Sequence, residues 1–377
     1  MKKILHIITG LNNGGAEGVL YRLCVNDNNH IHFVISFLDM GKYGPMLKNQ
    51  GVEVFCLDMK QGDFSIKAFW ILFKIIKKIN PDIVQTWMYH ADLIGGTCAK
   101  LAGVKNVFWN IRSSDLDKKS SKRTTWFVAR LCAILSYFLP VKIICCATDA
   151  KKWHLELGYS NNFELIGNGF DVNFYEQILS SDQLDVRLAL NLDPKAKIIG
   201  MVARLDPQKD HFNLIEALSE IKKNTNHLFK CVLVGKGLDL KNYDFIKYLS
   251  SYDLENEVLL LGQRNDVPKI MASLDVHVLS SAYGEGFPNV VAESMCCGTP
   301  NVVTDVGDSK YIVGETGIVV SPRSSKELAT ALIKFFEIIE KEPERWSKMR
   351  SAAKERAHNN FCLNRMIDQY HAVWFSK

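Results

Sequence analysis

Residues 283–300 read YGEGFPNVVAESMCCGTP and follow an apolar run, residues 276–279, that is typical of a buried strand. Pro288 stands at an expected helix start and Gly298 at its end, so the order is strand, glycine-rich loop and helix. A loop that passes from a parallel strand to a helix N-terminus presents backbone N–H groups and the positive end of the helix dipole. We therefore expect this loop to bind an anion such as a phosphate.

Two glutamates lie in this stretch, Glu285 in the loop and Glu293 in the helix. At the rise of a helix their carboxylates are on the order of 10 Å apart, a span that fits the two ends of a nucleotide sugar around its diphosphate. The alternative is that both are solvated acids, one in a loop and one on a helix surface. Support for a binding site must come from the rest of the chain.

The chain has 377 residues, a length that favours two domains, and its 47% hydrophobic and 23% charged content is that of a globular protein. The ten cysteines form no Cys-x-x-Cys, which favours reduced core residues of a cytosolic protein over a zinc site or a disulfide framework. The apolar N-terminal run stops near Thr9, too soon for a signal peptide. The apolar run 131–141 is too short to span a membrane.

The net charge of +5 is unevenly distributed. Residues 1–168 hold 21 Lys and Arg against 13 Asp and Glu, whereas residues 169–377 hold 25 against 28. A basic first half favours an anionic partner such as a phosphate or a membrane surface. No recognition-helix, zinc-finger or RNP-type motif accompanies this charge, so nucleic acid is not an expected partner.

Strands and helices alternate along the first half. Apolar runs typical of strands cover residues 3–9, 32–37, 52–57, 83–86, 107–111 and 141–147, and helical patterns cover residues 16–25, 65–79 and a segment from about 92. This alternation indicates βαβ units, a parallel sheet and an α/β fold class.

Candidate ligand-binding residues follow several of these strands. Gly14 and Gly15 would allow close backbone approach to a ligand, although they equally fit a plain tight turn. His90 and Arg112 come just after strand ends, where open α/β sheets bind ligands. For His90, capping or packing is the alternative.

A basic and aromatic segment follows Arg112. It comprises Lys118, Lys119, Lys122, Arg123, Trp126 and Phe127 and leads into an apolar helix that ends near residue 139. This composition fits an element at a membrane surface, and a solvated basic face is the alternative. Asp115 and Asp117 form an Asp-x-Asp in this charged loop, for which we expect no metal.

A second α/β series follows residues 165–171, where two glycines flank Asn168 and are able to absorb a hinge rotation. Its expected strands are residues 198–203, 230–234, 258–261, 276–279 and 301–304. Arg204 and Lys209 follow the first of these strands and precede a helix, so both charges and the helix N-terminus would converge on one diphosphate.

Five motifs occur in a fixed order along the chain. They are Gly14-Gly15-Ala16-Glu17, Asn168-Gly169-x-Asp171, Arg204-Leu-x-x-x-Lys209-Asp210, Gly235-x-Gly237 and Glu285-Gly-Phe-x5-Glu293. This set, which covers essentially the whole chain, resembles the retaining glycosyltransferases of family 4, which have the GT-B fold. The resemblance implies two Rossmann-like domains with parallel sheets facing a central cleft. Residues 1–168 would bind the acceptor, with a helix at about 362–377 crossing back, and residues 169–361 would bind a nucleotide-sugar donor.

The resemblance also implies roles for individual residues. Arg204 and Lys209 would hold the donor diphosphate, Glu285 the sugar hydroxyls and Glu293 the ribose, while His90 would face the donor sugar. Further donor contacts would come from Gly14, Gly15, Gly235, Arg264, Phe287, Pro288 and the backbone N–H groups of Asn289 and Val290. Arg112 and Asn168 would contact the acceptor.

The activity implied by the resemblance is transfer of a hexose or N-acetylhexosamine from a UDP-sugar to a growing glycan on polyprenyl diphosphate, in surface polysaccharide assembly. No metal or other cofactor is expected. The enzyme would be cytoplasmic and would associate peripherally with the anionic inner face of the plasma membrane. The alternatives are a GT-B sugar-nucleotide epimerase and a non-catalytic sugar-nucleotide-binding partner of another transferase.

Overall fold

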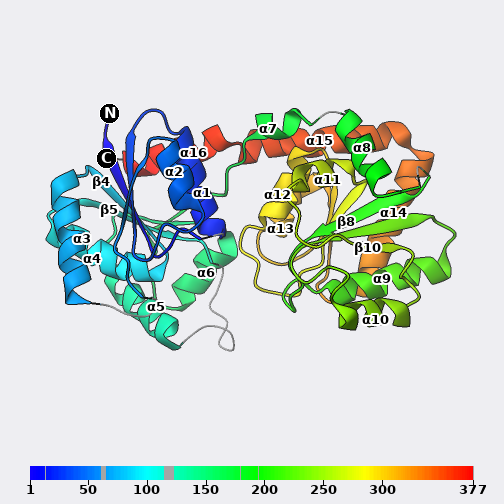
Figure 1. Cartoon of the computed structure of the whole chain (residues 1–377), viewed down its shortest axis with the longest axis horizontal. Helices are drawn as coiled ribbons and strands as arrows, with labels where there is room; N and C mark the ends of the chain where they lie inside the picture. The colour runs from blue at the N-terminus through cyan, green and yellow to red at the C-terminus, as the bar shows by residue number, and fades with distance from the viewer. Residues whose placement is uncertain (13, 61–64, 114–122, 179, 194, 377) are drawn as a thin grey trace. The chain divides into compact units, whose positions relative to one another are not determined.

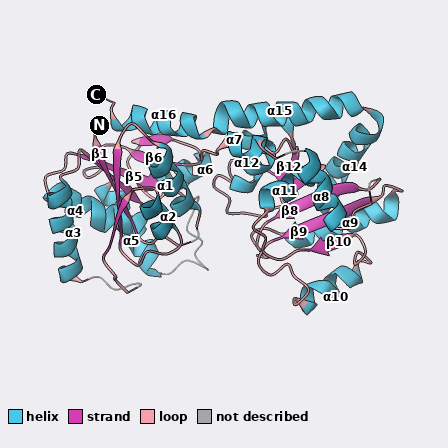
Figure 2. Ribbon diagram, turned by 45° about the horizontal axis from the view of Figure 1, so that its top comes forward, coloured by secondary structure: helices cyan, strands magenta, loops and turns pink. Residues whose placement is uncertain are grey.

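The computed structural model describes the chain except for residues 13, 61–64, 114–122, 179, 194 and 377. The chain forms two compact units, Met1–Gly169 with Leu363–Lys377, here unit 1, and Phe170–Cys362, here unit 2. Each unit is a parallel sheet covered by helices on its faces (Figures 1 and 2). This confirms the expected α/β fold with two Rossmann-like sheets. The structure places the two unit boundaries after Gly169 and after Cys362. The sequence analysis placed each boundary one residue earlier, after residues 168 and 361.

The sheet of unit 1 has the strand order β3-β2-β1-β4-β5-β6-β7. Its strands are β1 Lys3–Ile8, β2 Ile31–Ser36, β3 Glu53–Cys56, β4 Ile83–Trp87, β5 Asn106–Ile111, β6 Ile143–Cys145 and β7 Phe163–Leu165. The central strands are buried because both faces of the sheet are covered, as expected of a parallel sheet, and the buried residues include the polar His6, Gln85 and Thr86.

The helices of unit 1 connect these strands, except for α16, which follows the last strand of the chain. They are α1 Gly15–Asn26, α2 Tyr43–Asn49, α3 Ile66–Ile79, α4 Gly96–Leu101, α5 Arg123–Leu135, α6 Thr148–Glu156 and α16 Leu363–Trp374, and a π-helical turn covers Ala91–Gly95. The sequence marks α3 at both ends. The Ser65 side chain accepts a hydrogen bond from the backbone N–H of Ala68, and Asn80 ends the helix in the left-handed conformation.

The sheet of unit 2 has the order β10-β9-β8-β11-β12-β13. Its strands are β8 Lys197–Val202, β9 Phe229–Val234, β10 Val258–Leu260, β11 Val276–Leu279, β12 Asn301–Thr304 and β13 Ile318–Val320. Its helices are α7 Val172–Glu176, α8 Ser180–Ala189, α9 His211–Asn224, α10 Tyr243–Ser251, α11 Val267–Ser273, α12 Asn289–Cys296, α13 Ser309–Val313, α14 Ser325–Lys341 and α15 Pro343–Phe361, with a 3-10 turn at Gly314–Thr316.

Both sheets reverse their strand order beside their first strand, at β1/β4 in unit 1 and at β8/β11 in unit 2. The connections on the two sides of such a point leave in opposite directions, which opens a crevice at the carboxyl ends of the two strands. The topology therefore marks one candidate ligand site in each unit.

The last helix, α16, belongs to unit 1 although it follows the whole of unit 2. Its buried face consists of Leu363, Met366, Ile367, Tyr370 and Trp374. Gly169 leaves room for it, because a Cβ atom at this position would lie 2.8 Å from the Cβ atom of Met366. No described helix is long and apolar enough to cross a membrane.

Candidate active site

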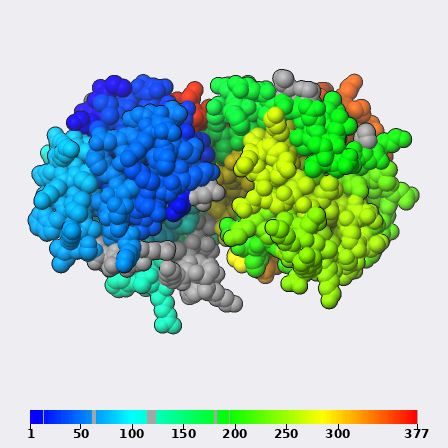
Figure 3. Space-filling view, viewed as in Figure 1, coloured from blue at the N-terminus to red at the C-terminus, as the bar shows by residue number. Residues whose placement is uncertain are grey.

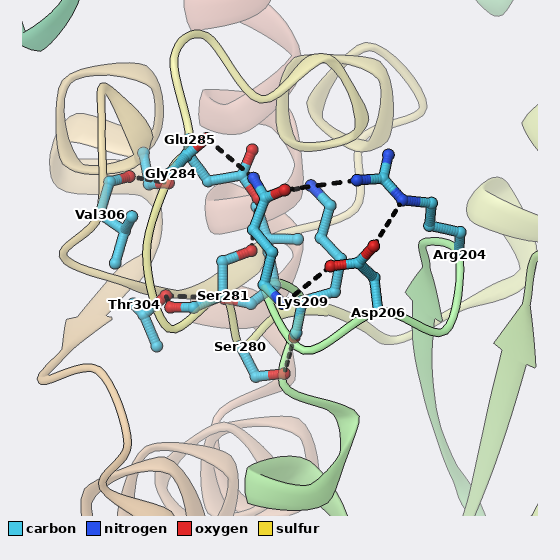
Figure 4. A network of polar contacts seen from close by, with 12 residues as sticks. Arg204, Asp206, Lys209, Ser280, Ser281, Gly284, Glu285, Thr304 and Val306 are labelled. Carbon is cyan, nitrogen blue, oxygen red and sulfur yellow. Dashed lines mark hydrogen bonds and ion pairs between the residues drawn. The ribbon is translucent and has the colours of Figure 1, made fainter. Parts of the chain in front are cut away.

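The site in unit 2 is built from the two loops that follow β8 and β11. The backbone N–H of Ala282 donates to the carbonyl of Gln208 at 2.8 Å, and the Gln208 side-chain amide donates to the carbonyl of Gly284, also at 2.8 Å. These bonds fasten the loops together at the switch point (Figure 4). Residues that are 76 positions apart in sequence thereby become neighbours.

Lys209 and Glu285 form a buried ion pair in this site. Their Nζ and Oε1 atoms lie 2.5 Å apart, and the side chains are 16% and 7% exposed. The hydroxyl of Ser281 donates to the same carboxylate oxygen at 2.5 Å (Figure 4). Because an ammonium has three donors, Lys209 is able to bind an anion while it keeps Glu285.

Arg204 is the exposed cation of the site. Its side chain is 58% exposed, and its Nε donates to Asp206 Oδ2 at 3.0 Å. Burial would raise the pKa of Asp206, but hydrogen bonds from the Gln208 backbone N–H and from Arg204 hold that pKa below its usual value. An ionised Asp206 therefore orients the guanidinium, whose other N–H groups include donors suited to a phosphate.

The N-terminus of α9 lies directly after Lys209. Asp210 caps the helix from the left-handed conformation, with its carboxylate accepting from the backbone N–H of Asn213. The hydroxyl of Ser280 lies 3.0 and 2.9 Å from the carbonyl oxygens of Lys209 and Asp210, which holds this turn against the β11 loop. Burial, with a smaller effect of Lys209, lowers the pKa of His211 to about 4, so this imidazole adds no charge at neutral pH.

Two glycines allow further loops to approach the site. At Gly235, whose φ is +152°, a Cβ atom would lie 2.0 Å from the carbonyl oxygen of Ala203. At Gly307, whose φ is +59°, a Cβ atom would lie 2.4 Å from the carbonyl oxygen of Glu285. A side chain at either position would therefore clash with the backbone of the neighbouring loop. The backbone N–H of Asp308 donates to the carbonyl of Gly286 at 2.9 Å and closes the loop over Glu285.

The helix that carries Glu293 begins as expected, with Pro288 as its cap and the N–H groups of Asn289 and Val290 in its first turn. Glu293 is half-buried. Phe287 is buried and packs against the rings of Phe170 and Phe361, with centroid distances of 6.4 and 5.5 Å. Its side chain thus supports the core, and any contact to a ligand would come from its backbone.

Arg264 lies in a different environment. Its guanidinium makes a two-point contact to Asp266, with Nε 2.8 Å from Oδ1 and a terminal nitrogen 2.6 Å from Oδ2. It lines a cavity of about 210 Å³ together with residues of α8 and α11. The predicted donor contact of Arg264 would have to compete with this pair.

The switch point of unit 1 carries the other predicted residues. Gly14 caps α1, and a Cβ atom there would lie 2.3 Å from Glu17 Oε2, whereas Gly15 has open space. His90 is half-buried, which lowers its pKa and keeps it neutral at physiological pH. It directly precedes the π-helical turn and follows Met88, whose φ is +70°. Both features concentrate at functional sites.

The sequence analysis missed Asp92, which lies two positions after His90 in the π-helical turn and is fully buried. Its Oδ1 accepts from the hydroxyl of Thr86 at 2.5 Å, and its Oδ2 has no hydrogen-bond partner among the residues that the structure describes. Burial raises the pKa of Asp92 to about 7. Asp206, Gln208 and Ser281 were missed as well, although the first two lie between the predicted Arg204 and Lys209.

Arg112 and Asn168, both predicted to contact the acceptor, bind each other inside unit 1. Arg112 donates to Asn168 Oδ1 at 2.7 Å, to the carbonyl of Ile166 at 3.1 Å, to Asn110 Oδ1 at 2.8 Å and to the hydroxyl of Tyr370. The guanidinium therefore anchors the segment that leaves unit 1 to the helix that returns. The acceptor role of both residues stays a prediction.

The predictions for Asp115, Asp117, Lys118, Lys119 and Lys122 fall outside the described residues. Arg123 is described and is exposed at the start of α5.

Unit 2 is similar in sequence to a known protein family, and the whole chain is similar in fold to solved structures. Residues 182–356 match the family described as "Glycosyl transferases group 1". The solved structure of Anabaena Alr3699/HepE in complex with UDP superposes with a TM-score of 0.83 over 100% of both chains at 24% identity. The fold is therefore GT-B, and the family match in unit 2 supports a glycosyltransferase.

Two curated relatives are similar over long stretches. UDP-Gal:alpha-D-GlcNAc-diphosphoundecaprenol alpha-1,3-galactosyltransferase of Escherichia coli is 28% identical over 253 residues, which are 66% of this chain and 64% of the relative. N,N'-diacetylbacillosaminyl-diphospho-undecaprenol alpha-1,3-N-acetylgalactosaminyltransferase of Campylobacter jejuni is 24% identical over 382 residues, which are 96% of this chain and 98% of the relative. Both names describe transfer to a sugar on undecaprenyl diphosphate.

Proposed function

We propose that this protein is a retaining glycosyltransferase that moves a hexose or N-acetylhexosamine from a UDP-sugar to a glycan on polyprenyl diphosphate. The observation that carries the proposal is the grouping of Arg204, Lys209 and Glu285 at the switch point of a unit that matches a glycosyltransferase family. The donor class is supported by the neighbour solved with UDP and with UDP-glucose. The acceptor class is supported by the names of the relatives.

The chemistry follows from the charges of the site. When the bond between the sugar and the diphosphate breaks, negative charge grows on the leaving oxygen, and Lys209 and Arg204 stabilise it. The departing phosphate oxygen accepts the proton of the acceptor hydroxyl as the acceptor attacks from the same face. This route retains the configuration, in agreement with the alpha linkage in both relatives' names. Because two side-chain cations balance the charge, we infer that no metal is needed.

The remaining residues would orient the donor. Glu285, held by Ser281 and Lys209, would accept hydrogen bonds from sugar hydroxyls. Glu293 would bind the ribose, and the N–H groups of Asn289 and Val290 would bind phosphate oxygens at the start of α12. His90, kept neutral by burial, would hydrogen-bond the sugar.

The acceptor would be reached at a membrane surface. The helix α5 and the turn after it expose Phe127, Ile134 and Phe138 to 70%, 63% and 77%, and Arg123 and Arg130 are exposed on the same helix. Figure 1 shows α5 at the lower edge of unit 1, and Figure 3 shows atoms of its colour on the surface there. We infer that this surface rests on the anionic cytoplasmic leaflet, with each cation contributing about 1 kcal/mol. Co-sedimentation with anionic vesicles should be salt-sensitive and should weaken in a Phe127→Ser, Phe138→Ser variant. Equal recovery of both proteins in the supernatant at low salt would contradict it.

The test of the function is a donor screen followed by a transfer assay. Thermal shift with a panel of nucleotide sugars should single out one UDP-sugar, and that donor should then transfer to a synthetic polyprenyl-diphosphate sugar in the presence of EDTA. Conversion of the donor without acceptor would favour the epimerase, and binding without conversion would favour the non-catalytic partner. Loss of transfer in EDTA that Mn²⁺ restores would overturn the metal-independent route.

A further inference from the structure

A second cluster of ligand-type side chains lies in unit 1, where α16 meets the loop between α1 and β2. Asp27, His30 and His371 each offer one ligand atom, and these atoms all lie within 4.8 Å of one another. His371 Nε2 is 2.7 Å from Asp27 Oδ2, and the rings of His30 and His371 are 4.7 Å apart. Asp27 is buried, whereas both histidines are partly exposed.

A chain of buried hydrogen bonds holds Asp27 in place. The indole N–H of Trp87 is only a donor, so His6 Nδ1, 3.1 Å away, must accept from it. The proton of a neutral His6 is then on Nε2 and is donated to His32 Nδ1 at 2.9 Å. This leaves His32 Nε2 to donate to Asp27 Oδ2 at 3.1 Å.

These bonds orient the carboxylate of Asp27. Its Oδ2 accepts from His32 Nε2 at 3.1 Å and from His371 Nε2 at 2.7 Å, and its Oδ1 accepts from the backbone N–H of Asn29 at 3.0 Å. Asp27 is thus a buried and oriented carboxylate, with His32 as a supporting donor behind it, as is common for metal ligands.

A neighbouring group consists of His6, Cys24 and His32, whose ligand atoms also lie within 4.8 Å of one another. All three side chains are buried, and the hydrogen-bond chain occupies both nitrogens of His6 and of His32. Burial also raises the pKa of the Cys24 thiol, which disfavours the thiolate that a metal needs. This group is accordingly part of the packing.

We propose that Asp27, His30 and His371 form a binding site for Zn²⁺ that pins α16 to the loop between α1 and β2. One carboxylate and two imidazoles, with water in the fourth position, are an ordinary zinc ligand set. The ligand atoms would close around the ion by small side-chain rotations, and the partial exposure of the histidines provides an entry path. On binding through Nε2, His371 would carry its proton on Nδ1. The ion would tie the last helix of the chain to the first strand-to-helix repeat.

The test uses full-length protein without a tag, because His30 lies close to the N-terminus. Calorimetry with ZnCl₂ should show one saturable site, and zinc at 100 times Kd should raise the Tm of unit 1 by roughly 5 °C or more. The His30→Ala variant should bind at least about 10-fold more weakly. The His358→Ala variant, which changes an exposed histidine on α15, should bind like the native protein.

Co²⁺ serves as a spectroscopic probe of the ligands. The proposed site should give d–d absorption without a thiolate-to-metal charge-transfer band. Such a band would place the ion on a cysteine and overturn the proposal, as would the lack of saturable zinc binding or equal affinity in His30→Ala. Chelation should lower the Tm of the zinc-loaded protein and leave glycosyl transfer unchanged. The zinc proposal and the proposed activity are therefore tested by separate measurements, and either one is able to be wrong without the other.

Discussion

The Lys209→Met substitution would separate the structural role of the buried ion pair from its chemical role. Methionine keeps most of the length of the lysine stem and removes the ammonium. Of the two donors to the Glu285 carboxylate drawn in Figure 4, the Ser281 hydroxyl then remains. Breaking one partner of a buried pair costs about 3–5 kcal/mol, because an uncompensated charge stays behind. Since Lys209 is 16% exposed, we expect the lower end, about 3 kcal/mol.

The double variant Lys209→Met, Glu285→Gln is the matched control. Glutamine removes the uncompensated charge and still accepts from Ser281, so at least half of the lost stability should return. Turnover should not return. Both variants should lose about 100-fold or more, because the leaving diphosphate has lost a cation in each.

The assay must report on unit 2 alone, since two units need not unfold together. Trp346 is the single tryptophan between residues 170 and 362, and it packs against Phe335 in unit 2. Urea unfolding of protein labelled with 5-fluorotryptophan, followed by ¹⁹F NMR, would therefore give the stability of unit 2 from one resonance. A Trp346→Phe variant assigns that resonance.

Two results would refute this reasoning. If Lys209→Met is as stable as the native protein, the Glu285 carboxylate does not depend on the Lys209 ammonium for its stability in the folded state. If the double variant regains turnover together with stability, the ammonium acts on folding and not on the leaving group.

Other substitutions test single residues of the two sites. Arg204→Ala should cut turnover about 100-fold, because the leaving diphosphate loses a cation. It should change the free energy of unfolding by less than about 1 kcal/mol, because the ion pair of Arg204 with Asp206 is at the surface. A near-normal rate would remove the central role of Arg204. Glu293→Gln should weaken calorimetric binding of UDP and Glu285→Gln should not; the reverse pattern would mean that the donor lies the other way round. The raised pKa of Asp92, about 7, means that the folded state holds a proton that the unfolded state releases, so the contribution of Asp92 to native stability should fall as pH rises from about 4 to about 7. The Tm of Asp92→Asn should lack this component of the pH dependence of the native protein, and equal pH profiles would contradict the assignment.

Much of the fold could be predicted because local sequence patterns report local structure. Residues 276–279 and 301–304 were expected as strands from their apolar runs, and they are β11 and β12 in the structure. The cap of α12 at Pro288 followed from the fixed φ of proline. Arg204, Lys209 and Glu285 were predicted from their places after strand ends, which parallel sheets bring to one edge.

Side-chain partners depended on the tertiary structure. The pattern of residues 204–210 does not show that Lys209 meets Glu285, since this contact requires β8 and β11 to be neighbours in the sheet. Arg112 was expected to bind a ligand, yet the return of α16 supplies the Tyr370 hydroxyl that takes up part of its guanidinium.

The sequence by itself thus determined the alternation of strands and helices, the change of unit near residue 169 and the positions of the strand-end charges. Each of these features depends on periodicity or backbone conformation over a few residues. Only the tertiary structure decided which charges are buried, paired or oriented. Asp27 and His371 are 344 positions apart and meet because the last helix packs on the first sheet. Such a contact depends on the path of the whole chain, and no local pattern contains it.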